Sequence, residues 1–91
     1  MRTIIVSPQF KRDVKLARKR NLPEDDLLTI VRDLAEDKEL PANKHDHALT
    51  GNFKGYRECH IHPDWLLIYK KEDGDIRILK LSRTGTHSDL F

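Results

Sequence analysis

Five consecutive apolar residues, from Trp65 to Tyr69, constrain the fold of this chain more than any other stretch. A short apolar run with an aromatic residue at each end is typical of a β-strand covered on both faces, because an exposed face needs alternating polar residues. Immediately before the run lie His60, His62 and Asp64, three side chains that can take up or hold protons. The sequence therefore predicts a buried strand that serves as a rigid platform for a site at its entrance.

The size of the chain limits it to one domain. Residues 1–91 are expected to form a single domain, because a second core would leave each half too small to bury enough surface. No apolar run approaches the roughly 20 residues that span a bilayer, and the run near the start is too short for a signal peptide. Cys59 is the single cysteine and cannot form an internal disulfide. We therefore expect a cytoplasmic protein without a membrane partner.

The charges are segregated along the chain although the net charge is only +2. Residues 1–20 carry seven basic groups against one acid, Asp13, whereas residues 24–39 carry seven acids against Arg32 and Lys38. Two interpretations remain open. Each segment can be the solvated face of a helix, or the first can form a basic surface that attracts a polyanion, above all nucleic acid.

The N-terminal part of the chain is predicted to form one strand and two helices. Residues 2–6 are rich in β-branched side chains, which is typical of a short strand. Ser7 and Pro8 then supply an N-cap hydroxyl and a first-turn proline for a helix that ends near Asn21. Pro23 opens a second amphipathic helix with six residues in its apolar stripe. These are Leu27, Leu28, Ile30, Val31, Leu34 and Ala35. The two helices are expected to form a hairpin that lies on a flat apolar surface.

The C-terminal half is predicted to contain a loop and three strands. Residues 39–52 are a loop by composition. Strands are expected at 53–61, 64–71 and 75–83. Asp73-Gly74 indicates a hairpin between the last two strands, and the apolar tail residues Leu90 and Phe91 indicate that the tail docks on the domain. The resulting element order, β-α-α-β-β-β, belongs to the α+β class.

Four histidines lie within 18 positions of one another: His45, His47, His60 and His62. Histidine exchanges protons readily near neutral pH because its ordinary pKa is about 6.5. Each His-x-His pair would place both imidazoles on one face of a strand, which permits metal chelation. No cysteine partner or His-Glu-x-x-His spacing supports a zinc site, however. Scattered surface histidines and a metal-free acid/base site are the other interpretations. We favour the last, and expect neither a metal nor a cofactor.

The segment from Arg83 to Ser88 gathers several polar groups around Gly85. A guanidinium, three hydroxyls and an imidazole can together hold a phosphate, with the arginine bidentate and the histidine supplying or removing a proton. Simpler alternatives remain open at this stage. Arg83 can be a surface charge, Asp64 can merely begin a strand, and Trp65 can be a core anchor.

A specific series of short motifs runs through the second half of the chain. In order, these are Asp46-His47, Gly55-Tyr56-Arg57, His60, Pro63-Asp64-Trp65 and Arg83-Thr84-Gly85-Thr86-His87. With these motifs the chain resembles, over essentially its whole length, the YafQ-type mRNA interferases of the RelE/ParE toxin superfamily. The resemblance implies a RelE-like fold, with a two-helix hairpin on one face of a mainly antiparallel, twisted sheet. It also implies a ribosome-dependent endoribonuclease that cleaves mRNA in the A site and is neutralised by a cognate antitoxin of the DinJ/RelB type.

The same resemblance assigns functional roles to seven positions. These are His47, His60, Asp64, Trp65, Arg83, His87 and Phe91. RNA carries its own nucleophile, the 2′-hydroxyl, so cleavage needs only a base, an acid and a cation that stabilises the phosphorane. We expect Arg83 to clamp the phosphate and His87 to be the general acid. His47, His60 and Asp64 share the base and its orientation, in an order that the sequence leaves open. Trp65 and Phe91 are expected to position a base or sugar. His45 and His62 lie outside this set.

The remaining partner predictions concern polyanions. Lys54, with Lys70, Lys71 and the basic first helix, is expected to contact substrate and ribosomal RNA. Operator DNA is expected only through the antitoxin complex. Two alternatives stay open: a ParE-like toxin acting on DNA topoisomerase, and a non-catalytic module that binds nucleic acid or the antitoxin. The full set of histidine, aspartate and arginine side chains argues against a toxin that only binds its target.

Overall fold

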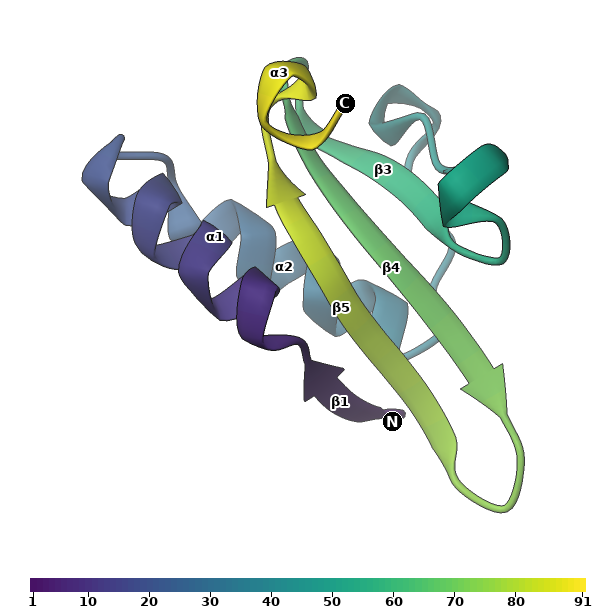
Figure 1. Cartoon of the computed structure of the whole chain (residues 1–91). Coiled ribbons are helices and arrows are strands. Elements are labelled where there is room, and N and C mark those ends of the chain that lie inside the picture. Colours follow the sequence, from purple (N-terminus) through teal and green to yellow (C-terminus); the bar gives the residue numbers. More distant parts are fainter.

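The structure of the chain, a computed structural model, describes residues 1–91 and is built on one five-stranded sheet (Figure 1). The strands are β1 (Thr3–Val6), β2 (His47–Ala48), β3 (Arg57–His62), β4 (Trp65–Asp73) and β5 (Arg77–Gly85). The helices are α1 (Pro8–Lys19), α2 (Glu24–Ala35) and α3 (His87–Leu90), with two 3-10 turns, η1 (Ala42–Lys44) and η2 (Gly51–Phe53). The predicted α+β fold with a mostly antiparallel sheet is confirmed. None of its helices has the length and apolar character needed to cross a membrane.

The central position of β4 follows from the sheet order, which is β1-β5-β4-β3-β2. β3, β4 and β5 are antiparallel neighbours, and β2 pairs with the outer edge of β3. β1 pairs with β5 in the parallel direction, so the first and last strands of the chain lie side by side. No residue from Trp65 to Tyr69 is more than 2% exposed. This confirms the prediction of a strand that is buried on both faces.

The two long helices begin where the sequence predicts. The Ser7 hydroxyl accepts a hydrogen bond from the backbone N–H of Phe10, and Pro8 occupies the first turn of α1. Asn21 follows the end of α1 in the left-handed region, at φ 58°, a conformation that asparagine tolerates better than most residues. Pro23 precedes α2, and the three acids of its first turn suit the positive end of the helix dipole.

Two separate clusters of buried side chains flank β4. The larger, on the face covered by α1 and α2, contains 14 buried residues, among them Trp65, Leu67 and Tyr69. The smaller, on the opposite face, consists of Leu66, Ile68 and Leu90. We call this opposite face, which bears no long helix, the open face of the sheet. The tail therefore docks through Leu90, as the sequence predicts.

The structure corrects several details of the predicted elements. The expected loop at 39–52 contains the short strand β2, and the tail forms a helical turn, α3. β3 begins at Arg57 rather than at residue 53, which lies in η2. Leu28, expected in the apolar stripe of α2, is 50% exposed, because the stripe is already filled by its neighbours. Asp73 pairs with Arg77 at the end of the β4–β5 hairpin, so residues 74–76 form the turn.

Candidate functional site

The register of the sheet places four side chains in one row across the open face. His47 pairs with Glu58, Glu58 pairs with Ile68, and Ile68 pairs with Arg83. Residues that stand directly opposite each other in a ladder point to the same face. Since Ile68 belongs to the cluster on the open face, the other three residues also lie on that face. His60 pairs with Leu66 and joins them one step further along β3.

A β-bulge in β5 brings Arg83 to this face. Tyr69 pairs with Leu81 and Ile68 pairs with Arg83, which leaves Ser82 as an extra residue in β5. Simple alternation from Leu81, a residue of the larger core, would have turned Arg83 toward the helices. The extra residue reverses the alternation. Arg83 therefore shares a face with Glu58 and His60.

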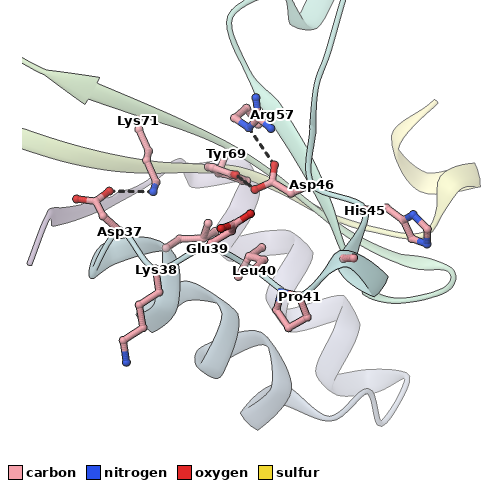
Figure 2. Close-up of a pocket in the computed structure, with 12 residues that line it drawn as sticks. Asp37, Lys38, Glu39, Leu40, Pro41, His45, Asp46, Arg57, Tyr69 and Lys71 are labelled. Atoms are coloured by element: carbon pink, nitrogen blue, oxygen red, sulfur yellow. Dashed lines mark hydrogen bonds and ion pairs between the residues drawn. The ribbon is translucent and has the colours of Figure 1, made fainter.

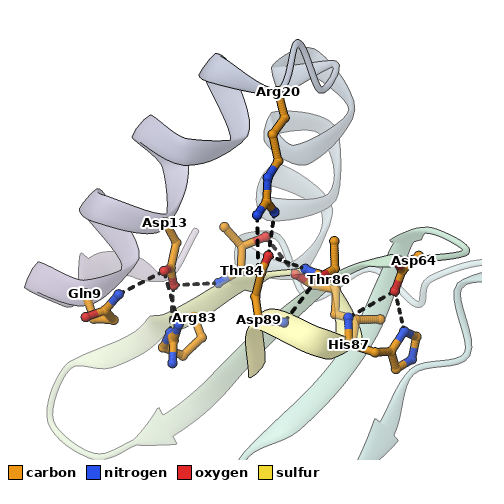
Figure 3. Close-up of polar contacts among 10 residues, drawn as sticks. Gln9, Asp13, Arg20, Asp64, Arg83, Thr84, Thr86, His87 and Asp89 are labelled. Atoms are coloured by element: carbon orange, nitrogen blue, oxygen red, sulfur yellow. Dashed lines mark hydrogen bonds and ion pairs between the residues drawn. The ribbon is translucent and has the colours of Figure 1, made fainter. Parts of the chain in front are cut away.

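The turn after β5 is folded so that His87 lies at the edge of the open face. Thr86 and Asp89 form a capping box, in which each side chain accepts a hydrogen bond from the other's backbone N–H. Asp89 is also held by two hydrogen bonds from Arg20, at the end of α1 (Figure 3). A Cβ added at Gly85 would lie 2.9 Å from the Cβ of Asp89, so this close approach requires glycine.

His87 is paired with Asp64, the residue that precedes β4. One oxygen of Asp64 accepts hydrogen bonds from Nδ1 of His87 at 2.6 Å and from its backbone N–H at 3.0 Å (Figure 3). These bonds, the backbone one first, lower the pKa of the Asp64 carboxyl below its ordinary value. The ionised carboxylate fixes the imidazole tautomer with the proton on Nδ1 and the lone pair on Nε2. In the structure, the carboxylate of Asp64 therefore supports the imidazole of His87 and not that of His60.

The imidazole of His60, on β3, faces the imidazole of His87, on α3. The centroids of the two imidazoles are 5.7 Å apart, in an edge-to-face arrangement. On its other side His60 contacts the imidazole of His45, with a centroid distance of 5.2 Å. A hollow of about 480 Å³ lies beside His60 and is lined by residues 43–45 and 60–63. His45, expected to be peripheral, therefore lies against the site.

Glu58 is a site residue that the sequence analysis missed. Its side chain is 7% exposed and lies between two histidines, with Oε1 at 3.6 Å from Nε2 of His60 and 3.7 Å from Nε2 of His47. A signal was present in the sequence. Cys59 and Ile61 are core residues of β3, so strand alternation places Glu58 and His60 together on the opposite face.

The guanidinium of Arg83 is held by a carboxylate from α1. Arg83 donates to both oxygens of Asp13, at 2.8 and 3.2 Å, and the backbone N–H of Thr84 donates to the same carboxylate (Figure 3). Hydrogen bonding to Asp13 raises the pKa of the Arg83 guanidinium above its ordinary value. β1 pairs with β5 only as far as Leu81, so the N–H of Thr84 has no strand partner at this edge of the sheet. Asp13 occupies the edge at this point. The lone acid among the first 20 residues is therefore the anchor of the predicted phosphate clamp.

The hydroxyls expected around a phosphate are mostly engaged elsewhere. The Thr84 hydroxyl is buried and donates to the carbonyl oxygen of Leu66 at 2.7 Å. The Thr86 hydroxyl caps α3. The predicted cluster of Arg83, three hydroxyls and His87 thus reduces to the arginine, the histidine and exposed Ser88.

Comparison with known proteins identifies the family. A family of bacterial toxins of type II toxin–antitoxin systems, YafQ, has a sequence model that matches residues 2–91. The mRNA interferase toxin YafQ of Escherichia coli strain K12 is 45% identical over 91 residues, which cover 99% of this chain and 96% of the relative. The chain belongs to the YafQ family of bacterial toxins.

Solved structures of related toxins share the fold. A metal-bound toxin from Helicobacter pylori superposes with a TM-score of 0.92 at 38% identity, and the match covers 100% of both chains. A chain of the Escherichia coli DinJ–YafQ toxin–antitoxin complex superposes with a TM-score of 0.86 at 45% identity, covering 99% of this chain and 97% of that chain. The resemblance to YafQ-type toxins and to the RelE-like fold is confirmed.

The aromatic residues that YafQ resemblance places in the site differ in accessibility. Trp65 is 2% exposed and belongs to the core beneath the helices, with the ring of His62 stacked against it. The structure therefore supports the core-anchor interpretation of Trp65 and leaves little of its ring accessible to a nucleobase. Phe91 is 64% exposed, and its ring contacts Phe53 edge-on at a centroid distance of 5.8 Å. Phe91 thus presents an open aromatic surface at the end of α3.

The remaining residues considered for this toxin's site differ in where they lie. Lys54 is exposed at the end of η2, on the turn that leads into β3. Nε2 of His62 donates to the carboxylate of Asp26 in α2 at 2.7 Å, so His62 lies outside the site, as expected. Cys59 is fully buried, and this burial raises its pKa to about 12. Its thiol is therefore protonated at neutral pH and takes no part in the chemistry.

A polar cluster behind the site fixes the strand that carries His47. Asp46 accepts hydrogen bonds from the Tyr69 hydroxyl at 2.6 Å and from Arg57 at 2.9 Å (Figure 2). Burial, followed by the bond to Asp46, raises the pKa of the Tyr69 hydroxyl. The three residues line part of a hollow of about 460 Å³ between the sheet and the connection from α2. They hold the start of β2 against β3, and so set the position of His47 relative to Glu58.

Proposed function

We propose that this YafQ-family toxin is a ribosome-dependent endoribonuclease, which cleaves mRNA in the ribosomal A site by metal-independent attack of the RNA 2′-hydroxyl on the adjacent phosphate. One observation carries the proposal. The Asp64-supported imidazole of His87 faces His60 and Glu58 across a gap of a few ångströms. Two proton-transfer groups of opposite roles on one face are what this reaction requires.

His87 is the general acid in this mechanism. Its Nδ1 proton is held by the Asp64 carboxylate, which fixes the orientation of the ring. A protonated His87 then directs its Nε2 proton toward the leaving 5′-oxygen. After transfer, the neutral ring keeps its orientation because the bond to Asp64 remains.

His60 and Glu58 form the base. Glu58 is a largely buried carboxylate with an imidazole on each side, and it orients His60 and stabilises the charge that His60 acquires from the 2′-hydroxyl. His47 approaches the other side of Glu58, and its Nδ1 lies 2.6 Å from the carbonyl oxygen of His45. In this arrangement His60 exchanges the proton, whereas His47 and Glu58 hold the imidazole of His60 in position.

Arg83 stabilises the charge that develops on the phosphate. Asp13 holds one edge of the guanidinium, which leaves the other edge for a phosphate oxygen. Two strand spacings of about 4.8 Å each separate the backbones of Glu58 and Arg83, a gap that accommodates a sugar-phosphate unit. Phe91 supplies a stacking surface for an adjacent base, and Lys54 a cation for the RNA backbone. Trp65 acts through packing.

The setting of the reaction follows from the family and the charges. We infer a cognate antitoxin of the DinJ/RelB type, operator DNA bound only through the antitoxin complex, and action in the cytoplasm, where ribosomes translate mRNA.

Several basic residues of α1 are exposed and without an acidic partner. These are Lys11, Arg12, Lys15 and Lys19. They form a candidate surface for ribosomal RNA, whose phosphates make binding steeply dependent on salt.

The test compares matched variants on ribosome-bound and free message. His87→Gln and Arg83→Ala should each reduce cleavage by roughly 10²- to 10⁴-fold, whereas His62→Gln, outside the site, should cleave normally. Primer extension locates the cuts, and circular dichroism verifies folding. A ribosome-bound message with a 2′-deoxy sugar at the scissile position should resist cleavage. Normal cleavage by folded His87→Gln, or of the deoxy substrate, would refute the mechanism.

A further inference from the structure

A second row of side chains crosses the open face beside the row that contains Arg83. Ile68 pairs with Arg83, and two residues further along β4, Lys70 pairs with Lys80. Lys80 in turn pairs with Ile5 of β1. Two residues along a strand return to the same face after about 6.8 Å, a step comparable with the separation of successive phosphates in an extended RNA strand. A pair of cations therefore lies next to the proposed phosphate clamp.

The two lysines are accessible and share a single acid. The side chain of Lys70 is 35% exposed and that of Lys80 is 42% exposed. Glu72 lies 2.9 Å from Nζ of Lys80 and 3.8 Å from Nζ of Lys70. Like charges that stand directly opposite each other destabilise a sheet, so the stability of the fold does not account for the lysine pair. Two ammonium groups beside one carboxylate leave a net positive charge for an anion.

Aromatic rings connect the lysine pair with the C-terminal tail. Nζ of Lys70 lies over the ring of Tyr56, 5.5 Å from its centroid. Tyr56 contacts Phe53 edge-on at a centroid distance of 6.4 Å, and Phe53 contacts Phe91 in the same way at 5.8 Å. A hollow of about 290 Å³ is lined by Tyr56, Lys80 and the end of β1. Aromatic rings interspersed with cations are typical of surfaces that bind single-stranded nucleic acid.

We propose that Lys70 and Lys80 bind the RNA phosphate next to the one that Arg83 holds, and that a neighbouring nucleobase enters the hollow beside Tyr56. RNA fits this subsite better than an acidic peptide does, because the row continues the site of Arg83 and presents a ring on which a base can stack. The subsite rests on the proposed ribonuclease function, since its occupant is the strand that the site cleaves. It lies away from the reacting atoms and contributes to binding rather than to proton transfer.

Binding is tested by fluorescence anisotropy with a labelled single-stranded 2′-O-methyl RNA, which lacks the nucleophile and is not cleaved. Lys70→Met should reduce the slope of log affinity against log salt by about 0.7, the value for one phosphate contact on a single strand. The matched control is Lys71→Met, which should leave the slope unchanged. Lys71 pairs with Leu79 of the larger core, faces the helices and is ion-paired with Asp37. The structure thus places Lys71 outside this surface, although the sequence analysis grouped it with Lys70.

Two further variants separate RNA contact from folding. Glu72→Gln removes a competing negative charge and should bind the same RNA roughly 1.5- to 5-fold more tightly. Tyr56→Leu keeps an apolar side chain but removes the ring, and should weaken binding about fivefold or more, whereas Tyr56→Phe should bind normally. An unchanged salt slope in folded Lys70→Met, or an equal reduction in Lys71→Met, would overturn the subsite. Normal RNA binding by Lys70→Met with lost binding of polyglutamate would assign the row to an acidic protein instead.

Cleavage of ribosome-bound message tests the role of the subsite in the reaction. Lys70→Met should raise KM and leave kcat close to the wild-type value, because it removes an interaction that is equally strong in the ground state and the transition state. A reduced kcat with an unchanged KM would overturn this role. A protein that binds the oligonucleotide with the expected lysine dependence but does not cleave ribosome-bound message would refute the proposed function and leave the RNA-binding surface standing.

Discussion

The two faces of β4 are equally well buried but are covered in different ways. On one face, α1 and α2 close a core of 14 buried residues. On the open face, Leu66 and Ile68 are covered by Leu90 of α3. Leu49, Phe53 and Tyr56, from the segments around β2 and η2, flank them. The first interior is made by long elements that pack along their length. The second is made by short segments that also carry site residues.

Because of this difference, one face contributes mainly to the stability of the fold and the other to the geometry of the site. Leu90 fastens α3 to β4, and α3 positions His87 against Asp64 and His60. Short segments with few buried contacts open more readily than a main core. We infer that the helix-covered core sets the stability of the fold, whereas the small core sets the geometry of the site.

The largest expected effect comes from a pair of adjacent leucines on β4. Leu66 and Leu67 are both 0% exposed, but they point to opposite faces. Leu67→Ala should lower the free energy of unfolding by about 4 kcal/mol, because the surrounding helices cannot close the cavity. Leu66→Ala should cost about 2 kcal/mol, because α3 can settle into the gap. Urea denaturation measures both costs.

Cleavage should show the reverse order in conditions where both variants are folded. Leu66→Ala moves α3, and with it His87, so its activity should fall more than that of Leu67→Ala. Equal unfolding costs with equal activities would show that the two faces form one cooperative core, and the proposed division of tasks would fail.

Sequence patterns predicted the long elements because their signals are local. The Ser7-Pro8 helix start and the apolar run from Trp65 to Tyr69 act through nearest neighbours, and the structure contains both. β2 was missed because a strand of two residues exists only through its pairing with β3. α3 could have been predicted, since Thr86 and Asp89 have the spacing of a capping box.

Much of the membership of the site was predictable, although Glu58 was missed, but its pairings were not. The family resemblance named His60, Asp64 and His87, and the structure brings these three together. Which carboxylate supports which imidazole depends on strand register, which the sequence does not encode locally. The bulge at Ser82 decides the face of Arg83, and its partner Asp13 lies 70 residues away along the chain.

The next prediction concerns Asp13, the carboxylate that links the two faces. It belongs to the helix on one face and holds Arg83, which points to the other. Asp13→Asn should lower the free energy of unfolding by about 2 kcal/mol, since hydrogen bonds to charged groups contribute about 1.5–3 kcal/mol and Arg83 remains partly solvated. Cleavage should also fall, because the guanidinium is no longer oriented.

Urea denaturation and a double-mutant cycle with Arg83→Ala distinguish this role from simple destabilisation. Once Arg83 is absent, Asp13→Asn should cause little further loss of cleavage. The matched control is Asp25→Asn, an exposed acid in the first turn of α2. Independent, additive losses of activity in the double variant would remove Asp13 from the site.

The smallest expected effect is a pH-dependent one at the clamp that holds α3. Hydrogen bonds from Arg20 and from the backbone of Thr86 hold the pKa of Asp89 well below its ordinary value. A carboxyl whose pKa is lowered in the folded state stabilises the protein above its unfolded pKa of about 3.9, and this contribution is lost as the pH falls through the folded value.

Asp89→Asn should therefore cost about 1 kcal/mol at pH 7, a typical value for a capping residue. The difference between variant and wild type, measured by urea denaturation, should shrink as the pH falls below 3.9. A difference that stays constant down to pH 2 would mean that the charge of Asp89 contributes nothing to fastening α3, and that the ion pair with Arg20 has no part in keeping His87 in place.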